Sequence, residues 1–324
     1  MKTTLLIALA SLLLVGGGAQ AQMARQEFYP VQSTTLSDVD FLNGKKEGVP
    51  VTLAGALRLP KLGPEKLPAV VLLHGSGGVG GAGGMIDEWS IELNEIGIAT
   101  FAIDSFSGRS ITETVTDQTR LGRLNMIIDA YRGLDLLSKH RQIDPARIAV
   151  MGFSRGGQSA LYSSLLRFQK MHGPAGGLEF AAHIGFYAPC DTTFRGDDAP
   201  VAKPIRLLHG TADDYVAVGP CRAYVDRLSK SGKDIRLIEY PDAHHVFDAP
   251  AYKEPRKLGA ATTTRRCRMV ESDNGTVLNQ ETNQPFGYGD ACVERGPTVA
   301  YQEAGSAQAR AYVRGFLKEV LAPK

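Results

Sequence analysis

The feature that most constrains this chain is a serine between an apolar run and a helix-forming stretch. Residues 148–153 are apolar and lead into Gly152-Phe153-Ser154-Arg155-Gly156, after which residues 158–170 favour a helix. Glycines two positions either side of Ser154 permit a sharp strand-to-helix turn, where a larger side chain would collide with the backbone. The turn lifts the serine hydroxyl off the sheet edge and sets the Arg155 backbone N–H beside it. This pattern predicts a nucleophilic Ser154, and an ordinary tight turn is the alternative.

A glycine-rich loop follows the apolar run 69–73, which predicts a strand covered on both faces. Its sequence is His74-Gly75-Ser76-Gly77-Gly78. Glycine lets a backbone come close enough to donate N–H groups to a tetrahedral intermediate. We therefore expect the backbone N–H groups of Ser76 and Arg155 to form an oxyanion hole, with Gly77 near the substrate. A flexible glycine linker is the alternative, and the Lys-Ser/Thr of a phosphate-binding loop is missing.

Two adjacent aspartates follow the strand predicted for residues 204–208, in the sequence His209-Gly210-Thr211-Ala212-Asp213-Asp214. A carboxylate just beyond a strand end is where the acid of a catalytic triad belongs. Asp213 and Asp214 are both eligible, and the offset from Gly210 favours Asp213.

Two adjacent histidines, His244 and His245, stand in the loop after the strand predicted for residues 235–240. A neutral imidazole held by a carboxylate can take the proton of a serine hydroxyl and return it to the leaving group. Neighbouring side chains point in different directions, so we expect only one of the two to be catalytic.

Apolar periodicity predicts an α/β protein with a mostly parallel central sheet and helices on both faces. Alternation over residues 51–59 predicts an antiparallel hairpin within 28–59, with its turn at 43–48. Further strands are expected at 69–73, 97–103, 148–153, 182–188, 204–208 and 235–240, and helices at 85–96, 121–137, 158–170, 219–231 and 299–321.

Three side chains are candidates for substrate contact. Phe106 and Arg109 follow the strand predicted for 97–103, and loops at strand carboxyl ends line the sites of open α/β sheets. Trp89, the only tryptophan, lies on the helix predicted for 85–96. For Arg109, simple solvation is the alternative.

The first residues have the pattern of a secretory signal peptide. A positively charged start precedes an apolar run at residues 5–15, and Ala19-Gln20-Ala21 forms a small-x-small cleavage signal. We predict removal of residues 1–21, leaving one domain over 22–324. The apolar run is too short to span a membrane and no later run is longer, so we expect an exported protein, periplasmic or secreted.

Four cysteines in an exported chain favour disulfide bonds. Three pairings are possible, and we favour Cys190–Cys221 and Cys267–Cys292 because each pair falls within one region of the chain. The second pair lies in the polar segment 248–298, which is too long for an ordinary connection. We expect this insertion either to form a rim of the cleft or to be a stapled surface loop.

The composition indicates which partners to expect. The 324 residues are 43% hydrophobic with a net charge of +2, as in globular proteins rather than nucleic-acid-binding ones. No cysteine spacing suits a metal site, and the motifs require neither metal nor cofactor. The expected partner is a small molecule, and the oligomeric state is left open.

The order Ser154, Asp213, His245 over alternating strands and helices resembles an α/β-hydrolase, and in particular the dienelactone hydrolase family. In that family the triad histidine precedes a small residue and Phe, which selects His245. The resemblance covers residues 53–248. The matching motifs are Leu72-Leu73-His74-Gly75-Ser76-Gly77-Gly78, Gly152-Phe153-Ser154-Arg155-Gly156-Gly157, Gly210-Thr211-Ala212-Asp213-Asp214 and Tyr240-Pro241-Asp242-Ala243-His244-His245-Val246-Phe247.

The resemblance implies a hydrolase that cleaves carboxylic esters or lactones through an acyl-enzyme. Ser154 would attack, His245 would act as base and then acid, and Asp213 would orient it. The namesake enzymes of the family use a cysteine nucleophile and are compact cytosolic proteins, whereas exported serine members resemble general carboxylesterases. An amidase or peptidase with the same triad, and a non-catalytic binding protein on this scaffold, are the alternatives.

Overall fold

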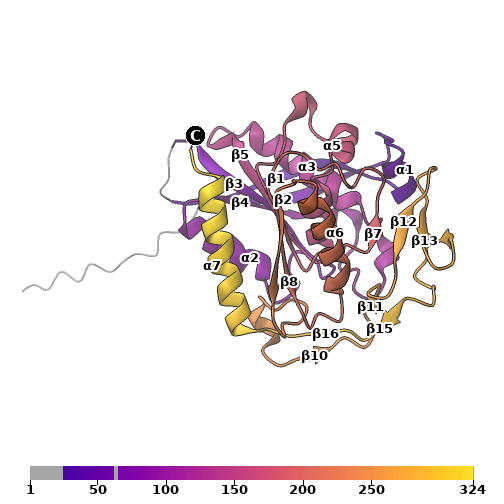
Figure 1. Cartoon of the computed structure of the whole chain (residues 1–324). Coiled ribbons are helices and arrows are strands. Elements are labelled where there is room, and N and C mark those ends of the chain that lie inside the picture. Colours follow the sequence, from indigo (N-terminus) through magenta and orange to yellow (C-terminus); the bar gives the residue numbers. More distant parts are fainter. Residues whose placement is uncertain (1–24, 62–64, 324) are drawn as a thin grey trace, which may run out of the picture.

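A computed structural model describes residues 25–61 and 65–323 (Figure 1). Its centre is an eight-stranded sheet in the order β1-β2-β4-β3-β5-β6-β8-β9. Strand β2 pairs antiparallel with both β1 and β4. The remaining strands of this sheet, β4, β3, β5, β6, β8 and β9, run parallel to one another. The predicted signal peptide, residues 1–21, lies outside the described residues. The strands are β1 Arg25–Thr35, β2 Val49–Leu59, β3 Leu67–Leu73, β4 Ala99–Asp104, β5 Ile143–Phe153, β6 His183–Phe186, β8 Ile205–Gly210 and β9 Ile235–Tyr240.

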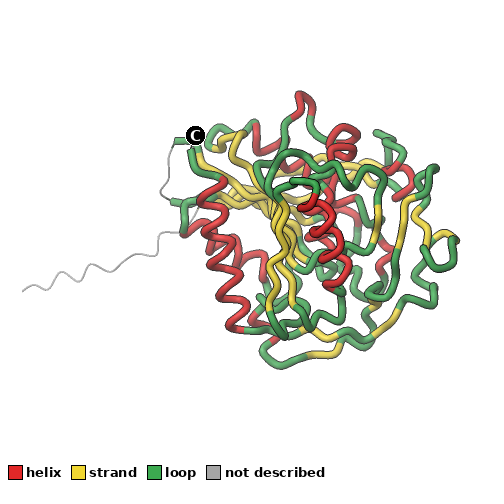
Figure 2. The backbone as a smooth tube through the Cα atoms, viewed as in Figure 1, coloured by secondary structure: helices red, strands yellow, loops and turns green. Residues whose placement is uncertain are grey.

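Helices cover both faces of this sheet, as the sequence predicts (Figures 1 and 2). One face carries α2 (Met85–Glu95) and α7 (Glu303–Val320), and the other carries α3 (Asn125–Ser138), α4 (Arg155–Tyr162) and α6 (Val218–Lys230). Strand β3 shows why both layers form. Its alternate residues enter opposite cores, because successive side chains of a strand point to opposite faces.

Two local expectations need correction. The helix predicted for 158–170 is two helices, α4 and α5 (Leu166–His172), separated around Leu165. The hydroxyls of Ser163 and Ser164 donate to the carbonyls of Ala160 and Leu161, and such local bonds compete with a continuing helix.

The hairpin connection is also more ordered than the turn predicted at 43–48. It contains the short helix α1 (Asp38–Leu42), whose N-cap Ser37 accepts a hydrogen bond from the Asp40 backbone N–H. The closing helix α7 begins at Glu303 rather than at 299, because Thr298–Val299 forms strand β16, which pairs with β10 (Arg256–Lys257). Both differences lie at connections, where local capping and pairing decide the boundaries.

The segment 248–298 forms small sheets at the edge of the molecule that carries the ends of the parallel strands (Figure 1). Both predicted disulfides are present, Cys190–Cys221 and Cys267–Cys292. Strand β12 pairs with β7 (Thr192–Thr193), which joins the insertion to the segment after β6. The remaining strands of the insertion are β11 Thr262–Thr263, β12 Met269–Glu271, β13 Val277–Asn279, β14 Gln284–Pro285 and β15 Glu294–Arg295.

A buried carboxylate fastens this insertion to the helical layer. Glu271 accepts hydrogen bonds from the guanidinium groups of Arg167 and Arg195, and from the Arg195 backbone N–H. The Glu271 side chain is fully buried, so its charge is balanced by these two cations rather than by water.

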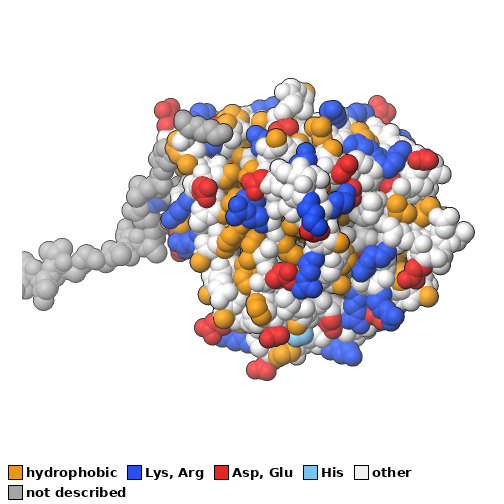
Figure 3. All heavy atoms as spheres, in the orientation of Figure 1, with side chains coloured by type: hydrophobic (Ala, Val, Ile, Leu, Met, Phe, Trp, Pro, Cys, Tyr) orange, Lys and Arg blue, Asp and Glu red, His pale blue; other side chains and the backbone are white. Residues whose placement is uncertain are grey.

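Acidic and basic side chains are interspersed over the face shown in Figure 3, in keeping with the net charge of +2. A surface of mixed sign does not offer the continuous basic stripe that nucleic acids bind. Of the helices in the described part of the chain, none is long and apolar enough to cross a bilayer.

Strand β6 begins with a buried histidine that makes stability depend on pH. His183 Nδ1 contacts the Ala160 carbonyl at 3.1 Å and the Ser163 hydroxyl at 3.0 Å. Burial lowers the pKa of His183 from 6.5 to about 4, because imidazolium is poorly solvated in the core. Between these values the unfolded chain binds a proton that the folded chain does not, so stability falls as the pH falls through this window.

We expect His183→Gln to flatten this dependence. Between about pH 7.5 and about pH 4.5 the variant should lose less stability than the native chain, by up to about 3 kcal/mol. Urea unfolding at several pH values measures the difference. The difference in the free energy of unfolding between the two chains at the higher pH gives the packing cost of the substitution. If the free energy of unfolding changes equally with pH in both chains, the prediction is contradicted.

Candidate active site

Ser154 stands between β5 and α4 with φ 53° and ψ −116°, a region that side chains other than glycine rarely occupy. The glycines two positions before and after Ser154 are required because a larger side chain would not fit there. A Cβ on Gly152 would lie 2.1 Å from the Gly156 carbonyl oxygen, and one on Gly156 would lie 2.2 Å from the Leu73 carbonyl oxygen. The turn predicted from the sequence is therefore present, and it holds the serine at the carboxyl end of the sheet.

Three loops at the carboxyl ends of β5, β8 and β9 bring the predicted triad residues together. His245 Nε2 lies 3.0 Å from Ser154 Oγ. His245 Nδ1 lies 2.8 Å from Asp213 Oδ2. The contacts thus run from hydroxyl through imidazole to carboxylate. In this arrangement Nε2 can take the hydroxyl proton while the contact of Nδ1 with the carboxylate keeps the ring in position.

Asp213 is fully buried and is held as an anion. Its Oδ1 accepts hydrogen bonds from the backbone N–H groups of Tyr215 (2.9 Å) and Val216 (2.8 Å). Burial alone would raise the pKa of Asp213, but the neighbouring His245 and His209 hold it well below the usual range for a carboxyl. An ionised carboxylate at this position can orient the imidazole and balance its positive charge.

The adjacent candidates Asp214 and His244 have other surroundings. Asp214 accepts hydrogen bonds from the Thr298 backbone N–H at 2.7 Å and its hydroxyl at 3.2 Å, and its Oδ2 lies 3.5 Å from Arg265 Nη1. His244 Nδ1 is buried without a hydrogen-bond partner in the described part of the chain. Asp214 therefore anchors the end of the insertion. The fold brings Asp213 and His245, rather than Asp214 and His244, into the line of contacts with Ser154.

The glycine-rich loop passes close to the serine. A Cβ on Gly75 would lie 3.4 Å from the Ser154 Cβ. Within residues 25–61 and 65–323, the backbone N–H groups of Ser76 and Arg155 find no acceptor. Arg155 opens α4, and the first N–H groups of a helix have no partner within it. Both N–H groups are thus available to an oxygen bound beside Ser154.

Two further buried histidines, His74 and His209, differ in their contacts. His74 donates from Nδ1 to the Gly75 carbonyl and accepts at Nε2 from the Ser105 backbone N–H, so it holds the glycine loop in place. His209 Nε2 lies 2.8 Å from the Val216 carbonyl and 3.3 Å from Asp213 Oδ2. The second contact is with the same carboxylate oxygen that His245 contacts, and it was not expected from the sequence.

Sequence analysis also missed two tyrosines that flank His245. The ring centroids of Tyr187 and Tyr215 lie 4.6 and 4.7 Å from that of the imidazole. The Tyr187 hydroxyl donates to the buried Asp248, which also accepts from the Trp89 indole N–H. Tyr187 directly follows β6, and that position is the signal that could have identified it, whereas Tyr215 lies in the loop after β8, two residues beyond Asp213.

Two cavities open at Ser154, and both are also lined by Ser76 and Tyr215. One has a volume of about 80 Å³, is largely apolar, and includes His245 and Gly77 in its wall. The other has a volume of about 60 Å³ and is lined mostly by residues with polar side chains. The insertion 248–298 supplies wall residues to both cavities, so it forms a rim of the cleft. Its wall residues are Tyr252 and Leu258 in the first cavity and Thr262, Thr263, Thr264 and Tyr288 in the second.

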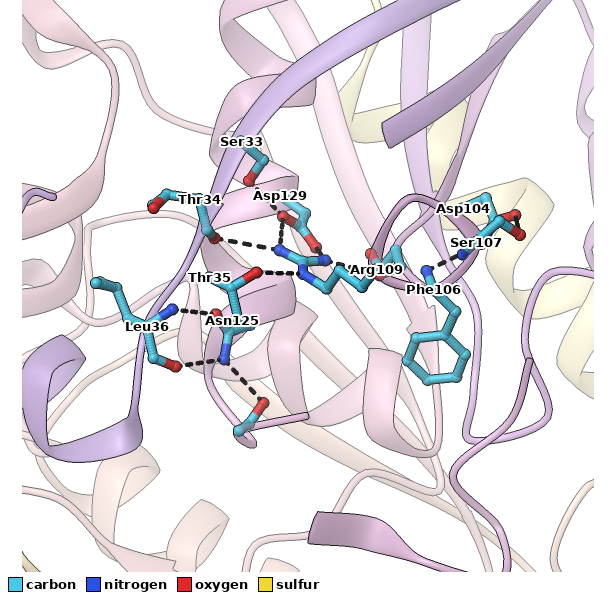
Figure 4. A network of polar contacts seen from close by, with 12 residues as sticks. Ser33, Thr34, Thr35, Leu36, Asp104, Phe106, Ser107, Arg109, Asn125 and Asp129 are labelled. Carbon is cyan, nitrogen blue, oxygen red and sulfur yellow. Dashed lines mark hydrogen bonds and ion pairs between the residues drawn. The ribbon is translucent and has the colours of Figure 1, made fainter. Parts of the chain in front are cut away.

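Three of the side chains expected near the substrate, Phe106, Arg109 and Trp89, do not line these two cavities. Arg109 binds Asp129 through both terminal nitrogens, at 2.7 and 2.9 Å, and donates to Thr35, so it ties β1 to α3 (Figure 4). Phe106 is buried against the ring of His74, with centroids 4.4 Å apart. Trp89 is fully buried in the core between α2 and the sheet. Each side chain packs inward, because the loop or helix that bears it turns that face toward the core.

No three His, Cys, Asp or Glu side chains of the described residues converge as the ligands of a metal ion would. The polar groups around Ser154 are instead hydroxyl, imidazole, carboxylate and backbone N–H. These are the groups that acyl transfer uses for attack, proton transfer and stabilisation of an oxyanion.

Comparison with known proteins agrees with this geometry. A model of the dienelactone hydrolase family matches residues 53–269. A dienelactone hydrolase-like promiscuous phosphotriesterase from metagenomic libraries is 17% identical, with a TM-score of 0.56 over 91% of this chain and 98% of that one. A propionate-bound esterase from Thermogutta terrifontis is 16% identical, with a TM-score of 0.54 over 85% and 92% of the two chains. The likeness to both structures is one of fold, and the expected α/β-hydrolase fold is confirmed.

The serine turn should tolerate no side chain at its first glycine. We expect Gly152→Ala to destabilise the protein by about 3 kcal/mol or more, because the added Cβ would meet backbone atoms that cannot rotate away. Thermal unfolding measures the effect. Gly219→Ala, on helix α6 with open space around the new Cβ, is the matched control and should change stability little. Equal effects of the two variants would show that the turn is not sterically constrained.

Proposed function

Because this chain belongs to the dienelactone hydrolase family, we propose that it is a serine hydrolase that cleaves carboxylic esters or lactones. The observation that carries the proposal is the line of contacts from Ser154 through His245 to the buried anion of Asp213. Two small cavities at Ser154 suit the two halves of a small ester. The family relationship supports ester chemistry, and the serine mechanism is inferred from the geometry.

In the proposed reaction, Ser154 Oγ attacks the carbonyl carbon while His245 Nε2 takes the hydroxyl proton. The Ser76 and Arg155 backbone N–H groups stabilise the oxyanion, and the Asp213 carboxylate balances the imidazolium. The C–O bond to the alcohol then breaks as His245 returns the proton to the departing oxygen. Water, deprotonated by His245, hydrolyses the resulting acyl-enzyme and frees Ser154.

Two rival functions remain to be tested against this one. An amidase or peptidase would use the same triad but would have to protonate a more basic leaving group. A binding protein on the same scaffold would need no proton transfer at all. A fluorophosphonate probe separates the second rival, because it labels only an activated serine.

We expect Ser154→Ala, His245→Gln and Asp213→Asn each to lower kcat/KM for p-nitrophenyl esters by about 10⁴-fold. Each removes one member of a unit in which attack and proton transfer depend on one another. A panel of p-nitrophenyl esters and small lactones provides the measurement.

The neighbouring residues offer matched controls for this series. Asp214→Asn and His244→Gln make the same chemical changes one position away, and each should stay within about tenfold of the native rate. A large loss in Asp214→Asn with activity kept in Asp213→Asn would reverse the assignment of the acid. Turnover of amides but not of esters by a Ser154-dependent enzyme would favour the amidase.

We further propose that the protein is exported and that residues 1–21 are removed. Its support is the signal-peptide pattern together with two disulfide bonds, which persist in oxidising compartments. The intact mass of protein from the periplasm or culture medium should correspond to a chain that begins at Gln22 with all four cysteines oxidised. Retention of residues 1–21 by an active cytosolic protein with free thiols would contradict this.

A further inference from the structure

The two N–H groups assigned to the oxyanion hole belong to loops that are far apart in the sequence and meet only in the fold. Ser76 lies in the glycine-rich loop after β3, and Arg155 opens α4 after β5. Both donors must lie about 2.7–3.1 Å from one and the same oxygen to stabilise it. The distance between the two loops is therefore as important to the proposed reaction as either N–H group.

Residues 114–121, a segment between β4 and α3, contact both loops. The Thr114 backbone N–H donates to the Ser76 carbonyl at 2.8 Å. At the other end of the segment, the Leu121 carbonyl accepts a hydrogen bond from Arg155 Nη2. One stretch of backbone thus holds both the glycine-rich loop and the residue that follows the nucleophile.

Side chains complete this connection. The Gln118 amide nitrogen donates to the Ser76 hydroxyl at 3.1 Å. The Gln118 amide oxygen accepts from the Thr114 hydroxyl at 3.3 Å and lies 3.4 Å from Arg155 Nη1. Arg155 Nη1 also donates to the Thr114 hydroxyl at 3.0 Å. The side chains of the two residues that offer the N–H groups are therefore joined through Thr114 and Gln118.

The Arg155 guanidinium has an uncommon environment for a buried cation. In the described part of the chain its side chain donates only to neutral oxygens, those of Thr114, Gln118 and Leu121. Burial lowers the pKa of Arg155, because the charged form loses hydration. A buried cation without a carboxylate partner costs stability. On the residue whose N–H would bind the oxyanion, however, a positive charge favours the negative charge that develops there.

We propose that Thr114, Gln118 and the Arg155 side chain are positioning residues that fix the distance between the two N–H groups of the oxyanion hole. This inference rests on the proposed esterase function and identifies what holds its oxyanion hole in shape. Loss of the connection leaves both N–H groups in the chain but lets the two loops shift. Stabilisation of the oxyanion then weakens, while binding of the planar ester changes little.

Thr114→Val and Gln118→Leu test the connection, because both substitutions leave the two N–H groups and the arginine charge in place. For p-nitrophenyl butyrate we expect each variant to lower kcat by about 10-fold, with KM within about 3-fold of the native value. Acylation and deacylation both pass through an oxyanion, so both steps should slow together. Thr114→Ser keeps the hydroxyl and should retain kcat within about 3-fold of the native value.

Inhibition by butyl trifluoromethyl ketone shows whether the oxyanion hole itself is affected. Ser154 Oγ adds to the ketone carbon, the C=O π electrons move to the oxygen, and the hydroxyl proton passes to His245. The inhibition constant should rise in Thr114→Val and Gln118→Leu by the factor by which kcat/KM falls, because the adduct and the transition state use the same N–H groups. A smaller fraction of folded enzyme would lower kcat and leave this constant unchanged.

The pH profile of kcat/KM shows whether the triad is intact in these variants. Its midpoint on the acid side reports the base, His245, and should not move, because the substitutions touch no triad contact.

Two other threonines provide matched controls. Thr116→Val makes the same change within residues 114–121, where the Thr116 hydroxyl donates to Glu113 at 2.6 Å. Thr192→Val removes a buried hydroxyl that donates to Asp191 at 3.2 Å, outside both loops. Each control should keep kcat and the inhibition constant within about 3-fold of the native values.

The outcomes separate the inference from the function beneath it. Provided that turnover depends on Ser154, the inference alone is overturned if Thr114→Val and Gln118→Leu keep the native kcat, or if they lower kcat without weakening the inhibitor. It is also overturned if the pH midpoint shifts, if the controls weaken the inhibitor equally, or if the ketone does not inhibit the native enzyme. If Ser154→Ala leaves turnover unchanged, or if the native chain does not cleave the ester, the proposed function fails and the inference fails with it.

Discussion

The close contact between the start of α4 and the carboxyl ends of β5 and β3 underlies the rest of the site. Gly152 and Gly156 meet backbone carbonyls at distances that leave no room for a side chain. This contact forces Ser154 to a positive φ, and the packed sheet and helices on both faces sustain the strain. Among the described residues, the same contact leaves the Arg155 N–H without an acceptor, and it brings the glycine loop against the serine.

Parallel strand order explains why residues far apart in the sequence meet here. The loops after β5, β8 and β9 all leave the same edge of the sheet, so the parallel strand order is enough to bring Ser154, Asp213 and His245 together. The insertion then closes over this edge. It lines both cavities, and its returning backbone pairs with His245, since the Ala300 N–H donates to the His245 carbonyl.

The three candidate contact residues that do not line the cavities share one property. Arg109, Phe106 and Trp89 stand near strand ends or on a neighbouring helix, where position alone allows either a site role or a core role. Their direction depends on partners such as Asp129 and Asp248, which are distant in the sequence. Tyr215 was missed because an aromatic side chain two residues after a predicted triad acid has no local pattern that distinguishes it from core.

The sequence by itself determined the sheet and its two helical layers, the serine turn, the glycine loop and the segments that hold the predicted acid and base, and it favoured both disulfide pairs among the three possible pairings. These features depend on local periodicity, on glycine at sterically closed positions and on turn chemistry, all of which are written in neighbouring residues. Only the tertiary structure showed that Asp213 contacts His245 while Asp214 contacts Thr298, added the contacts of His209, Tyr187 and Tyr215, and made the insertion a wall of the cleft. Adjacent residues have nearly identical local patterns, and the direction of a side chain becomes definite only when packing surrounds it.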